Sequence, residues 1–140
     1  MEIRKINPKY INDILKLDVR FTSPWKKETY FKRLDENPEL AYGSFKNDKL
    51  VGFILGRRLS SGNIKISRLV VHKDFEGRGI GGKLVDTLTN KPDTADKMIS
   101  IVREDNKRSI NLHKHRGFDI IPKDFTYKNG TKGIRFKKRL

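Results

Sequence analysis

Four glycines lie within one short stretch of the chain, and this spacing is the sequence's strongest chemical signal. They are Gly77, Gly79, Gly81 and Gly82, with Arg78 and Lys83 adding positive charge beside them. Glycine lets the backbone turn sharply and approach a ligand closely, and amides at the start of a helix bind anions. The apolar spacing of Ile80, Leu84 and Leu88 predicts a helix that begins at this loop. The pattern therefore predicts a phosphate-bearing ligand.

Two other phosphate-binding motifs share part of this pattern. Gly77, Gly79 and Gly82 fit a dinucleotide fingerprint, and Gly77, Gly82 and Lys83 fit most of a Walker A loop. In the dinucleotide motif the glycines follow the strand at once, whereas residues 72–76 intervene here, and an antiparallel meander precedes the loop. A Walker A loop needs a magnesium-binding hydroxyl where Leu84 stands. Both interpretations are therefore rejected.

Two blocks of the sequence together resemble the GNAT superfamily of acyl-CoA-dependent N-acetyltransferases. The family's first block is a strand, a short spacer and Gln/Arg-x-x-Gly-x-Gly/Ala opening a helix, matched here by residues 69–71 and 76–81. Its second block, Asn-x-x-Ala-x-x-x-Tyr-x-x-x-Gly-Phe, is matched from Asn106 to Gly117 and Phe118. The resemblance covers nearly the whole chain. It implies the GNAT fold, an α/β (α+β) structure with a mixed, splayed six- to seven-stranded sheet flanked by about four helices.

The resemblance also implies how acetyl-CoA would be held as cosubstrate. Backbone groups would bond the pantetheine arm at Leu69, Val70 and Val71. The pyrophosphate would lie in a cradle made of Gly77, Arg78, Gly79, Ile80, Gly81, Gly82 and Lys83. Asn106 would touch the cosubstrate from the other side of a gap between two parallel strands. These expectations agree with the physics, because peptide-like pantetheine pairs with strand edges and pyrophosphate with a helix start.

Two positions depart from the family pattern. Glu76 stands where Gln or Arg is usual, so one polar or cationic contact is lost. His113 stands where a Tyr usually protonates the departing thiolate. An imidazole with a pKa of about 6.5 can donate a proton to a thiolate with a pKa of about 8.5. His113 is therefore a candidate general acid; the alternative is that it only packs in the core and water supplies the proton.

Residues 64–69 and 98–102, the two strands that would border the gap, contain no carboxylate to act as base. Ile101 stands where some relatives have a Glu, and Glu104, just past the second strand, is a weak candidate base or a helix-start acid. Neutralising a lysine amine at pH 7 costs roughly 4–5 kcal/mol, against roughly 1–1.4 kcal/mol for an α-amine. The expected acceptor is therefore a protein or peptide α-amine, bound between the loop joining the first two helices and the loop at residues 124–132.

Residues 21–25 and Phe31 resemble the branch of protein N-terminal and ribosomal-protein alanine acetyltransferases. Two alternatives stay open beside that acceptor class. One is an acyl-CoA-binding protein with little catalytic activity, and the other is an acetyltransferase of a small-molecule amine. A basic nucleic-acid-binding domain with a vestigial loop is a third alternative, although no aromatic-interleaved basic motif supports it.

The elements needed to position these residues can be read from the apolar pattern. Strands are expected at 2–6, 40–45, 50–59, 64–71, 98–102, 118–121 and 134–138. Helices are expected at 8–20, from Ser23-Pro24 to near Asn37-Pro38, from Ile80, and from Ser109 to a cap at Gly117.

Composition sets the outer limits. The 140 residues fit a single domain, 1–140, and the absence of cysteine excludes disulfides, cysteine metal sites and a cysteine nucleophile; no metal site is expected. The net charge of +15 favours polyanionic partners, so ribosome or nucleic-acid association is conceivable without a motif that supports it. The first residues lack a signal-peptide pattern and no apolar run could span a bilayer, so a cytoplasmic protein with no membrane partner is expected.

Overall fold

The computed structural model describes residues 1–19 and 24–140. Its α-helices are α1 Ile11–Asp18, α2 Lys27–Glu36, α3 Ile80–Asn90 and α4 Lys107–His115, and short 3-10 helices lie at Pro8–Tyr10, Pro38–Leu40 and Lys73–Phe75. Its strands are β1 Glu2–Lys5, β2 Ala41–Lys46, β3 Lys49–Arg58, β4 Ile64–Val71, β5 Lys97–Arg103, β6 Asp119–Thr126 and β7 Lys132–Arg139.

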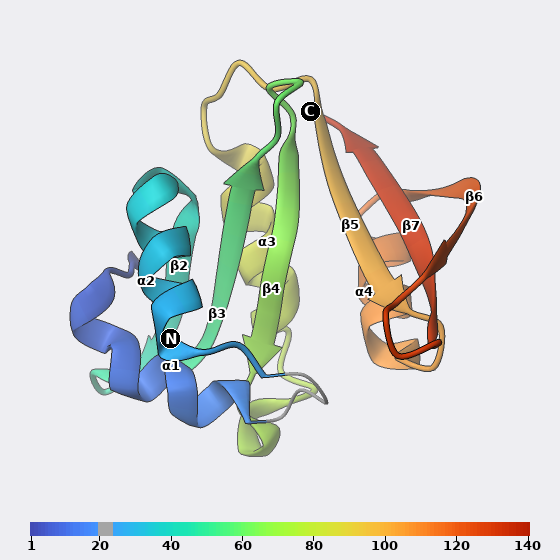
Figure 1. The fold of residues 1–140 in the computed structure, drawn as a ribbon. Coiled ribbons are helices and arrows are strands. Elements are labelled where there is room, and N and C mark those ends of the chain that lie inside the picture. Colours follow the sequence, from blue (N-terminus) through green and yellow to red (C-terminus); the bar gives the residue numbers. More distant parts are fainter. Residues whose placement is uncertain (20–23) are drawn as a thin grey trace.

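The strands form one sheet that splits between β4 and β5. Their order is β1-β2-β3-β4-β5-β7-β6, and every neighbouring pair is antiparallel except β4 and β5, which are parallel. These two strands share register only at Ile64 with Met98 and Lys65 with Ile99. Beyond that point they diverge, so the sheet opens as a V toward the carboxyl ends of both strands (Figure 1). The mixed, splayed sheet expected from the sequence is confirmed.

Helices cover the two faces of the sheet unequally. On one face α3 and α4 pack over a core that includes Ile64, Leu84, Met98 and Phe136. On the other face α1 and α2 pack over a second core that includes Phe53 and residues of β2 and β3. Figure 1 shows α1 and α2 gathered over the part of the sheet formed by β2 to β4, away from β5 and β7. The side of β5 and β7 opposite α4 therefore lies beyond these two helices.

A β-bulge in β4 changes which side chains face each layer. Leu55 pairs with Arg68 and Gly56 with Ile66, which leaves Ser67 as the extra residue. Such a bulge shifts the alternation of the strand by one residue. Ile66 and Leu69 consequently both pack toward α3, whereas Arg68 is directed toward α1 and α2.

Several expected boundaries need correction. The first helix, expected over 8–20, is divided into a 3-10 turn capped by the Asn7 side chain and an α-helix that ends at Asp18. The second helix begins at Lys27, three residues after Pro24, and Ser23 lies outside the described residues. Of the segment 21–25 that resembles the N-terminal acetyltransferases, residues 21–23 lie outside the described residues. The strand expected at 118–121 runs on as β6 to Thr126, so the loop expected at 124–132 contains only residues 127–131.

Candidate functional site

The glycine loop has the geometry of an anion cradle. After β4 ends at Val71, a 3-10 turn leads into Gly77 and Gly79, whose φ angles are 76° and 79°. Gly79 is the N-cap of α3. The first amides of an α-helix have no acceptor within the helix, so here they are donors available to a ligand. A Cβ added at Gly77 or Gly79 would meet no atom within 4 Å, which means that space is open where a phosphate would lie.

A cleft of about 170 Å³ lies between this loop and α4. Its lining consists of Val71, Phe75, Glu76, Gly77, Gly79, Ile80, Gly81, Gly82, Arg108 and Leu112. Three of these lining residues, Phe75, Arg108 and Leu112, were not expected from the sequence. A signal for the last two was present, since they follow Asn106 by two and six residues and so lie on the first turns of the helix that it begins.

Glu76, the departure at the start of the loop, is paired rather than isolated. Its Oε2 lies 3.4 Å from Nη1 of Arg108, with the Glu76 side chain 24% exposed and that of Arg108 64% exposed. The pair links the loop to α4 across the cleft. Arg78 lies 5.0 Å from the Phe75 ring centroid and Lys46 lies 5.5 Å from it. Three cations, Arg108, Arg78 and Lys46, thus stand around the loop.

The split in the sheet borders the predicted pantetheine site. In the part of the chain that the structure describes, β4 has no register partner in β5 after Lys65. Leu69, Val70 and Val71 follow that point, at the end of β4 that leads to the loop. An extended ligand with amide groups can pair with such a strand edge. The loop and the gap together agree with the coenzyme A site expected from the sequence, and the placement of its pyrophosphate at the start of α3 and its pantetheine beside β4 stays a prediction.

Asn106 is placed opposite the loop, at the start of α4. Its Oδ1 accepts a hydrogen bond from the Ser109 amide at 3.1 Å, so the side chain caps the helix. With Oδ1 occupied in this way, the Nδ2 group is the donor that a ligand would meet. A cosubstrate contact at Asn106 stays a prediction.

His113 is enclosed on the inner side of α4. It is 2% exposed, its ring stacks on Phe136 with centroids 5.0 Å apart, and Phe118 packs edge-on against it. Nδ1 lies 2.7 Å from the Ser109 carbonyl, which can only accept, so Nδ1 carries the proton. Nε2, 2.8 Å from Ser100 Oγ, then accepts from that hydroxyl.

Burial lowers the pKa of His113, and the hydrogen bond to the Ser109 carbonyl opposes this only in part. The side chain is therefore a neutral imidazole with both nitrogens engaged. This geometry accounts for its burial without any ligand, and its role as general acid stays a prediction.

The structure draws attention to a different carboxylate from Glu104, the candidate base named from the sequence. Glu104 lies in an exposed turn after β5, where its amide donates to the Lys132 carbonyl. Asp18, at the end of α1, is 1% exposed and accepts from the Tyr30 hydroxyl at 2.5 Å and the Trp25 amide at 2.7 Å. Burial, followed by the bond to Asp18, raises the pKa of the Tyr30 hydroxyl.

Asp18 also lies 3.8 Å from Arg68 Nη1, and the Arg68 guanidinium lies 4.2 Å from the Trp25 ring centroid. The cluster joins α1, α2 and β4 beside the open part of the V. Sequence reasoning missed Asp18, although a signal existed: it falls on the apolar stripe of α1, seven residues after Ile11 and four after Ile14.

The loop between β6 and β7 closes the other side of this region. Burial raises the pKa of the Tyr127 hydroxyl, while Arg103 and Arg68 act to lower it, which places Tyr127 within electrostatic reach of both strands of the gap. Phe125 packs edge-on against Tyr127 with ring centroids 4.9 Å apart. The acceptor region expected between the loop joining the first two helices and this loop stays a prediction.

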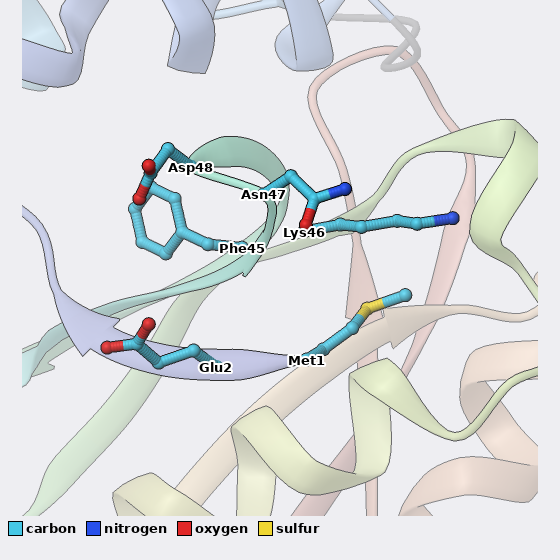
Figure 2. Close-up of a pocket in the computed structure, with 6 residues that line it drawn as sticks. All are labelled: Met1, Glu2, Phe45, Lys46, Asn47 and Asp48. Carbon is cyan, nitrogen blue, oxygen red and sulfur yellow. The ribbon is translucent and has the colours of Figure 1, made fainter.

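A larger hollow of about 500 Å³ lies at the opposite edge of the sheet, lined by Met1, Glu2, Phe45, Lys46, Asn47 and Asp48. Figure 2 shows the Glu2 and Asp48 carboxylates on one side of it and the Lys46 and Met1 side chains extending together on the other. These groups do not converge on a common point. Among the described residues, no three His, Cys, Asp or Glu side chains gather as a metal site requires. None of the described helices has both the length and the apolar character needed to cross a membrane.

Solved structures with this fold include several acetyltransferases. Ard1 from Thermoplasma volcanium superposes with a TM-score of 0.93 at 22% identity, covering 99% of this chain and 97% of that one. A NatC complex bound to Gag peptide and CoA gives 0.86 at 23% identity, covering 100% and 99%. The ribosomal-protein-S18-alanine N-acetyltransferase from Escherichia coli gives 0.80 at 17% identity, covering 99% and 92%. At these identities the likeness establishes the fold.

Similarity at the level of sequence is found as well. The chain is 30% identical over 87 residues to the UPF0157 protein YqkA of Bacillus subtilis (strain 168). That match takes in 62% of this chain and spans a quarter, 25%, of YqkA. The family model described as acetyltransferase (GNAT) family matches residues 11–118, which include the glycine loop and all of α4. The chain belongs to the acetyltransferase (GNAT) family.

Proposed function

We propose that this protein transfers an acetyl group from acetyl-CoA to a primary amine, and that the amine is the α-amine of a protein or peptide. The observation that carries the proposal is the position of the glycine loop, which follows β4 after a short 3-10 turn and opens at the start of α3, beside the gap between β4 and β5. One continuous site can thus hold a pyrophosphate and an extended arm. The neighbouring structure named for a bound Gag peptide and CoA supports the same pairing of ligands.

The reaction is a direct attack in a ternary complex. Bound acetyl-CoA supplies an activated thioester. The neutral amine nitrogen attacks its carbonyl carbon, the N–C bond forms and the C–S bond breaks, so the amine loses one proton and the thiolate gains one. The chain's own part is to hold the pyrophosphate with the amides from Gly77 to Gly82, to align the arm along residues 69–71, and to keep the acceptor nitrogen at the gap.

The lack of a carboxylate on the gap-facing strands favours an acceptor that loses its proton easily. At pH 7 an α-amine is neutralised for roughly 1–1.4 kcal/mol, and a lysine amine for roughly 4–5 kcal/mol. Asp18, the carboxylate of the Trp25–Tyr30–Arg68 cluster, already accepts two hydrogen bonds inside the protein. Proton removal through water therefore fits this site better than removal by Asp18, and an α-amine fits it better than lysine.

A second candidate function rests on the environment of His113. Because both nitrogens of this buried side chain have partners, the chain could bind an acyl-CoA while catalysing little. Purified protein, acetyl-CoA and a panel of amines, followed by release of the free thiol, separate the two functions. The panel contains peptides with a free α-amine, the same peptides blocked at the α-amine but carrying lysine, polyamines and aminoglycosides.

We expect turnover with the free α-amine peptides and little with the blocked ones. His113→Phe should reduce turnover while the affinity for CoA is kept if the imidazole is the acid. Stabilisation by acetyl-CoA without thiol release from any amine would support the binding function instead. Turnover confined to polyamines or aminoglycosides would overturn the peptide acceptor.

A further inference from the structure

One side of the split sheet carries a group of cations that the cosubstrate site does not use. Met98, Ser100 and Val102 of β5 are buried on the side of α3 and α4, so the residues between them in the strand point to the other side. That side presents Ile99, Ile101 and Arg103. We name the cations on it, Lys65, Arg68, Arg103 and Arg135, the cationic face.

The strand register brings these side chains together. Arg135 of β7 stands opposite Ile101, and Lys65 of β4 stands opposite Ile99. Residues opposite one another on neighbouring strands have Cβ atoms about 4.5–5.5 Å apart. The bulge at Ser67 shifts the alternation of β4, so the Arg68 side chain points to the same side as that of Lys65. Ile99 and Ile101 thus form an apolar floor with a cation on either side, and Arg68 and Arg103 stand farther along, toward the open end of the V.

Two of the four cations of this face are paired with carboxylates of the described residues, and the other two, Lys65 and Arg135, are not. Within the described residues, no carboxylate lies at ion-pair distance from Lys65 or Arg135. Arg103 meets the exposed Asp105 at 3.0 Å and Arg68 meets the buried Asp18 at 3.8 Å. Lys137 of β7 stands opposite Ile99 on the same side of the sheet, but it also stands opposite Asp119 of β6, so that pair adds no net charge.

The titration of Lys65 agrees with this arrangement. Burial lowers the pKa of its ammonium, and Arg57, Arg135 and Arg33 lower it further. Arg135 and Lys65 of the cationic face therefore repel one another, and a bound anion would relieve that repulsion. Arginine also suits carboxylates because its fork of N–H donors binds them in a bidentate way.

We propose that the cationic face recognises carboxylate side chains of the acceptor polypeptide, so that the preferred α-amine is followed closely by Asp or Glu. The inference rests on the proposed function, because it names the substrate class of the same site. The face borders the gap where the amine must meet the thioester, and Figure 1 shows the strands β5 and β7, which carry Arg103 and Arg135, away from α1 and α2. The apolar floor fits the backbone and stems of a peptide.

A nucleic acid suits the same face less well. Binding of a duplex backbone depends on cations that reach successive phosphates at the surface. Arg68 is only 9% exposed, and it is held among Trp25, Tyr30 and Asp18 on the floor of the site. This burial keeps Arg68 away from the phosphates of a duplex.

The test compares three peptides of one length and one first residue, in which the next two residues are acidic, neutral amides or basic. Two readouts are taken: kcat/KM for acetylation at saturating acetyl-CoA, and anisotropy of the same peptides, labelled at the carboxyl end, on protein loaded with CoA. We expect the acidic peptide to exceed the neutral one by about 10-fold in both, and the basic one to be poorest. Lys65→Gln and Arg135→Gln should each lower that preference several-fold.

Lys5→Gln is the matched control, because it removes the same charge from the exposed end of β1 at the far edge of the sheet. It should leave the preference intact, and stabilisation by CoA should confirm that all three variants fold. Equal binding and turnover of the three peptides would overturn the inference while leaving acetyl transfer standing. Acidic preference in anisotropy without turnover of any peptide would support the recognition and contradict the proposed function. Displacement of the acidic peptide by a DNA or RNA oligonucleotide at matched charge would overturn it in favour of nucleic acid.

Discussion

Gly79 combines two requirements that no other residue type meets at low cost. Its φ of 79° is left-handed, and it caps the helix whose first amides face the cleft. A left-handed φ costs a residue with a Cβ about 1–2 kcal/mol. Gly79→Ala should therefore lower the free energy of unfolding by about that amount and also weaken CoA binding, since a methyl group would enter the open space beside the amides. Urea unfolding and calorimetric titration with CoA measure the two effects.

Gly62→Ala provides the control for this prediction. Gly62 has a φ of 89° and also meets no atom within 4 Å at its Cβ position, but it lies in the turn between β3 and β4. It should show the same loss of stability with CoA affinity unchanged. Equal weakening of CoA binding in both variants would mean that the loss comes from general destabilisation and not from the cradle.

His113 gives the stability of the protein a pH dependence of its own. Burial lowers its pKa in the folded state, whereas in the unfolded chain an imidazole titrates near about 6.5. The unfolded state therefore takes up this proton first as the pH falls. Stability from the buried neutral imidazole is complete above about pH 6.5 and is lost as the pH falls below that value toward the folded pKa.

His113→Phe isolates this contribution, because it keeps an aromatic ring against Phe136 but cannot titrate. We expect lower stability at every pH, by about 1–3 kcal/mol, because the Ser100 hydroxyl and Ser109 carbonyl lose their partner. The fall in melting temperature between about pH 7 and 5 should become shallower. His115→Asn, at the exposed end of α4, should keep the original slope. A slope unchanged in His113→Phe would contradict the assignment.

At the scale of the elements, the separation of β4 and β5 at the site depends on how the two strands are joined at the closed end of the V. Strands β4 and β5 share only two register pairs there, and a polar clasp secures the connection from α3 to β5. Asp93 accepts two hydrogen bonds from the Arg58 guanidinium, at 2.9 and 2.8 Å, and one from the Ala95 amide at 2.9 Å. The Lys97 amide donates a further hydrogen bond to Asn63 Oδ1 at 3.2 Å. The clasp ties the end of β3 to the start of β5.

Asp93→Ala should therefore reduce stability by about 1.5–3 kcal/mol, the range for a charge-assisted hydrogen bond, and should speed hydrogen exchange at the amides of β5. The exposed pair of Arg33 and Glu36, at 3.1 Å, supplies the comparison, since Glu36→Ala should cost no more than about 1 kcal/mol. If the two variants lost the same stability and the amides of β5 stayed protected from hydrogen exchange, the clasp would not be what stabilises the closed end.

Sequence reasoning reached the elements whose signals are local. The helix start at Ile80 and the cap at Gly117, whose φ is 83°, are both encoded within a few residues, and each is confirmed. The bulge at Ser67 was not predicted, because a bulge is defined by the pairing of β4 with β3, and the sequence of β4 alone does not show that pairing.

The same limit applies to contacts that join distant parts of the chain. Arg68 reaches Asp18 across 50 residues, and Ser100 meets His113 through the packing of α4 on β5. For that reason the loop and its cosubstrate could be inferred from the sequence, whereas the acceptor side, built from such contacts, could not.

At the scale of the whole molecule, a net charge of +15 suits more than one anionic ligand, here a phosphate-rich cosubstrate and an acidic peptide. The fold separates them. The loop at α3 concentrates amides on one small anion, and the cationic face lies on the other side of the sheet, beside the gap. Of the basic residues, 12 fall between Arg103 and Leu140 against 4 acids, so the segment that forms α4, β6 and β7 carries much of the charge.

Acetyl-CoA should therefore stabilise the whole protein through a specific site, and its effect should survive salt. At 100 times the dissociation constant a ligand that binds only the folded state adds about 2.7 kcal/mol to the free energy of unfolding. Thermal melts with acetyl-CoA, repeated at about 0.05 and 0.2 M salt, measure this, with a DNA duplex as comparison. Binding of the duplex through general charge should weaken by orders of magnitude over that range. Stabilisation by acetyl-CoA should shift only modestly, because backbone amides in a cleft do most of the holding. A protein stabilised by the duplex but not by acetyl-CoA would instead use its basic surface for nucleic acid.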